Sequence, residues 1–314
     1  MHYPDYPFAS HYAVIQGHKL HYLDEGPRDA EPVIMLHGNP SWSYYYRHLV
    51  LALRDKYRCI VPDHIGMGLS EKPQAGQYPF TFERRAEDLD SLLDQLHIHN
   101  NITLIVHDWG GMIGMTWANR WPERVKRLVI LNTAAFHLPP HKHLPASLIF
   151  SRIPIINAIL NQGFNAFCRG AITYGMTRTR MSAEVAAAYL APYDNWSNRL
   201  AVRRFVEDIP IAPGDPGYDT ITTVADGLYR FRSLPILIGW GMKDFVFDVH
   251  FLNEWTRRFP AAELHRFADA GHYILEDAKA ELIPIVCDFL NRHPVNSQIA
   301  EDTEITRNSL RNKI

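Results

Sequence analysis

Short apolar runs recur along the chain, and stretches with helical periodicity lie between them. Residues 33–36 form an apolar run between Pro32 and a His-Gly pair, which is the pattern of a buried strand. The other expected elements are a hairpin of strands at 11–16 and 19–24, strands at 58–62, 102–106, 125–131, 235–240 and 263–267, and helices at 43–54, 82–96, 112–120, 249–258 and 279–291. Buried strands that alternate with helices predict an α/β fold with a mostly parallel, eight-stranded sheet covered by helices on both faces.

The alternation stops between residues 134 and 219. This segment has no clear strand, contains proline-rich joints near 137–140 and 209–217, and includes a helical stretch at 181–190. We therefore expect a helical cap inserted between two strands of the sheet. The predicted organisation is a core over 1–133 and 220–294, a cap over 134–219, and a polar C-terminal tail over 295–314 that is mobile or forms an oligomer contact.

The composition excludes several classes of protein. With 314 residues, of which 46% are hydrophobic, the chain can bury a large core, and a net charge of −2 without a basic stripe argues against nucleic acid as a partner. Cys59, Cys168 and Cys287 are widely spaced, which predicts neither a disulfide framework nor a thiolate metal site. Without a recognisable signal peptide, this cysteine usage indicates a cytoplasmic protein. The most apolar window, 148–160, is too short and too interrupted to span a bilayer.

The stretch from residue 102 to 116 carries the clearest chemical signal. An apolar run meets the tight turn HDWGG at 107–111, and a helix-compatible segment comes next. This pattern resembles the nucleophile elbow of α/β-hydrolases, with Asp108 in place of serine, and no Gly-x-Ser-x-Gly motif occurs in the chain. We expect Asp108 to attack carbon and form an ester, which suits alkyl halides, epoxides and strained lactones. The alternative is that Asp108 only caps the following helix.

Two further residues complete a candidate catalytic triad. Asp244 comes after the seventh expected strand and His272 after the eighth. Because the carboxyl ends of parallel strands share one edge of a sheet, Asp108, Asp244 and His272 are expected to lie together there. His272 would activate the water that hydrolyses the ester, while Asp244 would orient the imidazole ring. Asp248 is close behind in the sequence, and either of the two later aspartates could instead cap a helix.

Two residues beside this triad are candidates for binding a halide or an oxyanion. The backbone N–H groups of Asn39 and Trp109 are the expected oxyanion donors. The indole N–H and the amide NH₂ can also solvate a departing halide without attacking carbon. The alternatives are an Asn-Pro turn at Asn39 and a core aromatic at Trp109.

Three motifs resemble the haloalkane dehalogenase group of α/β-hydrolases. They read HGNPSWSYYYR at 37–47, VHDWGG at 106–111 and GMKD at 241–244. The Asn39 and Trp109 pair, with Asp244 after the seventh strand and no carboxylate after the sixth, is similar to the third subfamily of that group. That subfamily is in turn similar to the β-lactone decarboxylases of bacterial olefin biosynthesis, and the cap stretches GFNAFCRG and APYDNW look like that branch. The resemblance implies a small apolar substrate and either a homo-oligomer or a pathway assembly.

Four functions are compatible with these residues. The leading hypothesis is a haloalkane dehalogenase that releases alcohol, halide and a proton, and the alternative is β-lactone decarboxylation with the same triad. Epoxide hydrolysis is a third possibility, for which the cap tyrosines Tyr174, Tyr189 and Tyr193 could protonate the opening oxygen. A non-catalytic receptor or scaffold is the fourth. None of these enzymatic hypotheses implies a metal or an organic cofactor.

Overall fold

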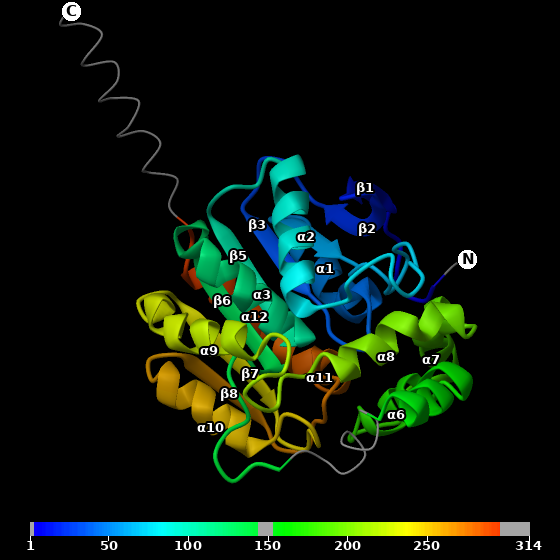
Figure 1. Cartoon of the computed structure of the whole chain (residues 1–314). Coiled ribbons are helices and arrows are strands. Elements are labelled where there is room, and N and C mark those ends of the chain that lie inside the picture. Colours follow the sequence, from blue (N-terminus) through cyan, green and yellow to red (C-terminus); the bar gives the residue numbers. More distant parts are fainter. Residues whose placement is uncertain (1–2, 144–152, 296–314) are drawn as a thin grey trace, which may run out of the picture.

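The computed structural model describes residues 3–143 and 153–295. Eight strands form one sheet, in the order β1-β2-β4-β3-β5-β6-β7-β8 (Figure 1). The strands are β1 His11–Ile15, β2 His18–Glu25, β3 Pro32–Leu36, β4 Arg58–Pro62, β5 Ile102–Asp108, β6 Val125–Thr133, β7 Ile236–Gly241 and β8 Glu263–Phe267. Only the β1–β2 and β2–β4 pairs are antiparallel. The predicted α/β fold with a mostly parallel eight-stranded sheet is therefore confirmed.

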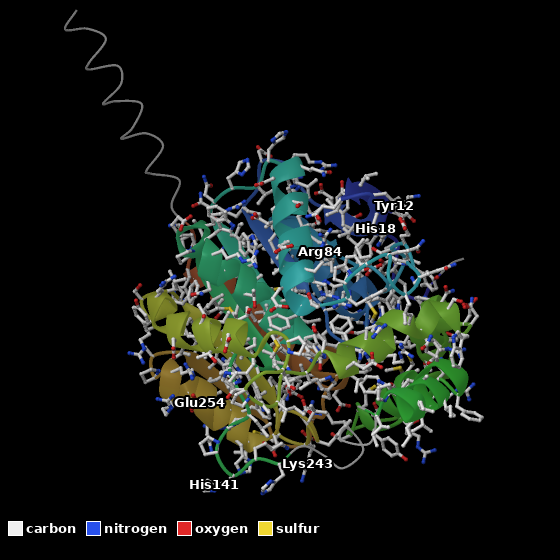
Figure 2. All side chains as sticks on the ribbon, viewed as in Figure 1. Tyr12, His18, Arg84, His141, Lys243 and Glu254 are labelled. Carbon is white, nitrogen blue, oxygen red and sulfur yellow. The ribbon has the colours of Figure 1, made fainter. Side chains whose placement is uncertain are left out.

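Helices cover both faces of the sheet, which explains why its central strands are apolar on both sides. All seven residues of β5 and all five of β4 are buried. The helices α2 Phe82–Gln95, α3 Trp109–Arg120 and α9 Tyr218–Gly227 lie on one face, and α1 Arg47–Leu53 and α12 Lys279–Arg292 lie on the other (Figure 1). The edge strand β1 instead alternates, so that Ala13 is buried while Tyr12 is exposed at the periphery (Figure 2).

Helical segments separate β6 from β7, and no strand occurs among the described residues between them. They are α5 Pro154–Asn157, the π-helix η3 Ala158–Gly163, α6 Ala166–Tyr174, α7 Ala183–Leu190 and α8 Leu200–Glu207, followed by α9. Helices α6, α7 and α8 lie together beyond one end of the sheet (Figure 1). The cap boundary predicted after residue 219 falls inside α9, which packs on α3, so the exact division stays a prediction. Residues 144–152, which include the first part of the apolar window at 148–160, and residues 296–314 of the expected tail lie outside the described residues.

Two predicted helices differ from the structure at their first turns. The helix expected at 43–54 begins as a 3₁₀ turn, Ser43–Tyr46, and becomes α-helical only in α1. The helix expected to begin at Met112 begins at Trp109, directly after β5. Glycine has low helix propensity, which hid the first turn of α3 from the sequence pattern.

The turn between β5 and α3 is crowded by neighbouring backbone. Asp108 adopts φ of +51° and ψ of −128°, a conformation that is rare for a residue with a side chain. A Cβ atom added at Gly110 would lie 1.9 Å from the carbonyl oxygen of Leu36, at the end of β3. The glycine therefore lets α3 begin close against β3, and this close approach brings the loop after β3 next to Asp108.

We expect Gly110→Ala to lower the free energy of unfolding by about 1–3 kcal/mol, because the added methyl group displaces the end of β3. Gly170→Ala is the matched control, since Gly170 lies inside α6 and an added Cβ meets nothing within 4 Å. That change is expected to raise stability by about 0.5–1 kcal/mol. Denaturant unfolding measures both variants, and equal midpoints would contradict the packing explanation.

Candidate active site

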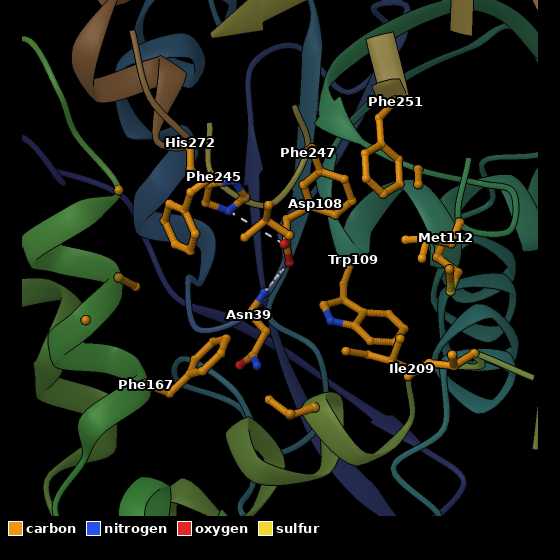
Figure 3. A pocket seen from close by; sticks show the side chains of 18 of the residues that line it. Asn39, Asp108, Trp109, Met112, Phe167, Ile209, Phe245, Phe247, Phe251 and His272 are labelled. Carbon is orange, nitrogen blue, oxygen red and sulfur yellow. Dashed lines mark hydrogen bonds and ion pairs between the residues drawn. The ribbon is translucent and has the colours of Figure 1, made fainter. Parts of the chain in front are cut away.

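Three predicted catalytic side chains meet at the carboxyl edge of the sheet. Asp108 ends β5, Asp244 lies in the loop after β7, and His272 lies in the loop after β8. The imidazole Nε2 of His272 is 3.5 Å from Asp108 Oδ2, and its Nδ1 is 2.7 Å from Asp244 Oδ2. Figure 3 shows the ring of His272 directed at the Asp108 carboxylate. The structure therefore brings together the nucleophile, base and acid expected from the sequence.

The carboxylate of Asp244 is held by hydrogen bonds on both oxygens. The backbone N–H groups of Val246 and Phe247 donate to Oδ1, at 2.8 and 3.1 Å. Asp248, the other candidate acid, accepts from the backbone N–H of His250 at the start of α10 Val249–Arg258 and pairs with Lys142. Asp248 thus acts as a helix cap, and only Asp244 reaches the imidazole.

Asn132, at the end of β6, also holds Asp244, and the sequence pattern did not identify it. Its Nδ2 donates to Asp244 Oδ2 at 3.0 Å and to the carbonyl of Gly241 at 3.0 Å. Its Oδ1 accepts from the N–H of Gly241 at 2.8 Å. The amide therefore ties the ends of β6 and β7 together. The only indication of this role in the sequence is that Asn132 directly follows a predicted apolar strand. In the sequence, that position established only that no carboxylate follows the sixth strand.

The loop that carries His272 is fixed through its backbone. His107 Nε2 lies 2.8 Å from the carbonyl oxygen of His272, and the N–H of Tyr273 donates to the carbonyl of Gly175 at 2.7 Å. Burial holds the pKa of His107 well below its usual value, so this histidine is neutral and its Nε2 carries the donated hydrogen. The contact with Gly175, which comes directly after α6, means that the cap helps to position the base.

The carboxylate of Asp108 accepts hydrogen bonds from two backbone donors. The N–H of Asn39 donates to Asp108 Oδ1 at 2.7 Å, and the N–H of Trp109 forms a second backbone hydrogen bond to the carboxylate. Burial raises the pKa of Asp108, and the charge of His272 and these hydrogen bonds oppose that rise. The pair of N–H groups is the arrangement expected of an oxyanion hole.

The two expected halide donors, Asn39 and Trp109, lie on the cavity wall and differ in whether their N–H groups already have a partner. Asn39 Nδ2 donates to the carbonyl of Val202 on α8 at 3.1 Å, so one of its two amide hydrogens is already used by the cap. Among the hydrogen bonds of the described residues, none uses the indole N–H of Trp109. Both residues line the cavity in front of Asp108 (Figure 3). Trp109 is thus the freer donor for a leaving group.

The cavity above Asp108 has a volume of about 490 Å³. Its walls come from the core and the cap and are mostly apolar, with Met112, Phe167, Ile209, Phe245, Phe247 and Phe251 among the lining residues (Figure 3). A buried carboxylate facing such a space is poorly hydrated, which strengthens it as a nucleophile and suits an apolar substrate.

Two of the three tyrosines considered for epoxide opening do not line this cavity. Tyr189 donates to Glu276 Oε1 at 2.7 Å, and Tyr193 donates to the carbonyl of Ser41 at 3.2 Å. Tyr174 does line the cavity, but most of its side chain is exposed. Tyr189 and Tyr193 are therefore structural links between cap and core, and the support for epoxide hydrolysis is reduced to one exposed tyrosine.

Within residues 3–143 and 153–295, no group of three or more histidine, cysteine, aspartate or glutamate side chains is arranged to hold a metal ion. The three cysteines are free thiols. None of the described helices is long and apolar enough to cross a membrane.

Comparison with known proteins now defines the family. Residues 31–279 match the family model of the alpha/beta hydrolase fold, so the chain belongs to the α/β-hydrolase family of enzymes. Within it, the chain is similar to two curated cis-3-alkyl-4-alkyloxetan-2-one decarboxylases. It is 53% identical to the protein of Shewanella oneidensis (90% of this chain, 89% of the relative) and 49% identical to that of Xanthomonas campestris pv. campestris (94% and 100%).

Haloalkane dehalogenases are more distant relatives. The chain is 37% identical to the enzyme of Psychrobacter cryohalolentis, over 93% of this chain and 95% of the relative. The crystal structure of a haloalkane dehalogenase from Bradyrhizobium elkani USDA94 matches with a TM-score of 0.78 at 27% identity, over 88% of this chain and 94% of that chain. The predicted resemblance to this group and to its decarboxylase relatives is confirmed.

We expect His272 to titrate above the ordinary histidine pKa of 6.5. Burial lowers the pKa of His272, but Asp244 and then Asp108 raise it by a larger total. Asp244 raises the pKa of His272 more than Asp108 does. Asp244→Asn should therefore lower this pKa further than Asp108→Asn does. NMR titration of the imidazole measures this order without any substrate, with His272→Gln identifying the signal. The reverse order would contradict the assignment of Asp244 as the dominant partner.

Proposed function

We propose that this protein is a β-lactone decarboxylase that converts a cis-3-alkyl-4-alkyloxetan-2-one into an alkene and carbon dioxide. The observation that carries this proposal is the 53% and 49% identity to two curated decarboxylases along nearly the whole chain. The cavity supports it, because an apolar space in front of a buried carboxylate suits a strained ring with two alkyl groups. The sequence motifs favour dehalogenation with decarboxylation as the alternative, and the identities to the two curated decarboxylases reverse that order.

The chemistry can be balanced with Asp108 as the only covalent participant. An Asp108 oxygen attacks ring carbon 4, the carbon that carries the ring oxygen, and the C4–O bond breaks to leave a carboxylate on carbon 3. The electron pair of the bond between carbon 3 and this carboxylate then forms the alkene. Carbon dioxide leaves, and the electron pair of the new C4–O bond returns to Asp108. This route consumes neither water nor a proton.

The surrounding groups have definite tasks in this route. His272 and the backbone N–H groups of Asn39 and Trp109 hold Asp108 in the orientation for attack. The free indole N–H of Trp109 is the donor that can stabilise the carboxylate released when the ring opens. The apolar walls keep the ester away from water, which prevents its hydrolysis before carbon dioxide leaves.

Haloalkane dehalogenation is the second candidate. It is favoured by the unused indole donor at Trp109 and by the 37% identity to a haloalkane dehalogenase. In this reaction Asp108 displaces halide, and water activated by His272 attacks the ester carbon of Asp108. The two candidates share the first displacement and differ in how the ester is resolved.

We expect purified protein to release alkene and carbon dioxide in equal amounts from a cis-3,4-dialkyl β-lactone, as gas chromatography and carbon dioxide detection would measure. Asp108→Asn should reduce the rate by about 10³-fold or more. In oxygen-18 water, the Asp108 peptide should stay unlabelled after a single turnover, because water never attacks its carboxyl carbon. A labelled peptide with a hydroxy acid product would replace the decarboxylase proposal by hydrolysis.

His272→Ala separates the two candidates when the brominated alkane and the lactone are compared side by side. With a short bromoalkane, the variant should release halide once and accumulate an alkyl ester, seen as added mass on the Asp108 peptide. With the lactone no ester should accumulate, since its breakdown needs no base. The control is His272→Ala combined with Asp108→Asn, which should carry no adduct from either substrate. If the bromoalkane leaves the single variant unmodified, the dehalogenase candidate is excluded.

A further inference from the structure

The cap segment from Pro154 to Gly163 has its polar side chains inside and its apolar side chains outside. Asn157 and Asn161 are 0% and 2% exposed, whereas Ile155 and Ile159 are 73% and 50% exposed. This is the reverse of an ordinary surface helix. The segment is α-helical in α5 and continues as the π-helix η3, a rare form that often occurs at functional sites. A reason for the buried amides must therefore lie on the inner side of the segment.

Hydrogen bonds fix the orientation of both amides. Asn157 Nδ2 donates to the carbonyl of Arg203 at 3.3 Å and to Glu207 Oε1 at 3.4 Å. Both partners are acceptors, so the Oδ1 of Asn157 must point the other way, where it accepts from Asn161 Nδ2. The Nδ2 of Asn161 is thereby committed to Asn157. Glu207 is itself held by ion pairs with Arg203 and Arg204 on α8, at 3.3 and 2.9 Å.

The remaining polar atom of Asn161 is its Oδ1. Asn161 lines the same cavity as Asp108 and His272. No donor among the described residues reaches its Oδ1, and Asn161 is not one of the residues with an additional partner. Asn161 Oδ1 is not one of the buried side-chain atoms that are sealed off without a partner, so this acceptor is open to the cavity and can receive a hydrogen bond from a bound ligand.

We propose that Asn161 forms a hydroxyl-binding subsite in the cap wall, which selects substrates whose chain carries a hydrogen-bond donor. Glu207 and Asn157 are positioning residues for it, because their hydrogen bonds hold the amide nitrogen of Asn161 and leave its oxygen for a ligand. The proposal rests on the proposed function only in treating this cavity as the substrate site. The subsite adds a preference for chains that carry a hydroxyl group, which apolar walls alone would not provide. A plain alkyl chain leaves the Asn161 oxygen without a hydrogen-bond partner.

The test is a binding experiment in the Asp108→Asn background, which lacks the attacking carboxylate of both candidate reactions. The probes are 1-bromoalkanes and the matching ω-bromoalcohols of four to ten carbons, titrated calorimetrically. At the chain length that reaches the subsite, Asn161→Leu should weaken the bromoalcohol about tenfold relative to its bromoalkane, the change expected for about 1.4 kcal/mol from one hydrogen bond. Asn157→Leu should produce a smaller loss of the same kind, because it frees the amide of Asn161 to rotate.

Phe167→Leu is the matched control, since it changes the cavity wall without a polar atom and should affect both probe series alike. Asn161→Ala repeats the test with a smaller side chain if Asn161→Leu does not fold. The subsite is overturned if every bromoalcohol keeps its affinity relative to its bromoalkane in the folded Asn161 variants. That result would not touch the proposed decarboxylation, which is measured by alkene release in the unaltered protein.

Discussion

The buried negative charge of Asp108 is the constraint on which the site depends. Burying a carboxylate is costly unless charges and hydrogen bonds compensate it. Here the compensation comes from three separate parts of the chain: Asn39 after β3, Trp109 at the start of α3, and His272 after β8. Because each donor is attached to a strand end, the order of the strands in the sheet determines whether these groups meet at the carboxylate.

The cap is joined to this arrangement by polar contacts and does not simply cover it. Tyr189 on α7 donates to Glu276, which also pairs with the buried Arg47 of α1. The carbonyl of Gly175 holds the backbone of Tyr273, next to His272, and the carbonyl of Val202 holds the amide of Asn39. A shift of the cap would therefore move the base and one oxyanion donor as well as the cavity wall. Substrate size and catalytic geometry are coupled through these contacts.

Sequence reasoning succeeded where position along a strand determines position in space. The grouping of Asp108, Asp244 and His272 could be predicted because each lies at or just after a strand end, and parallel strands end at one edge. Asn132 was missed because its partner lies 112 residues away and its type suggests only a turn. Tyr189 and Tyr193 were candidates for epoxide opening from their place in the cap, but the direction of a side chain depends on packing that periodicity does not encode. The amide orientation of Asn161 likewise depends on a chain of partners on another helix.

In the two reactions proposed for this site, the leaving group of the first displacement determines how the Asp108 ester is resolved. Once Asp108 is esterified, its charge no longer raises the pKa of His272, and a more neutral imidazole is a better base for attack by water. A halide can leave the cavity, and its departure allows His272 to activate water for hydrolysis of the ester. The carboxylate formed from a β-lactone cannot leave, because it stays bonded to the ester. In the proposed decarboxylation this carboxylate restores a negative charge within the cavity, which opposes the fall in the pKa of His272 and makes the imidazole a weaker base for attack by water.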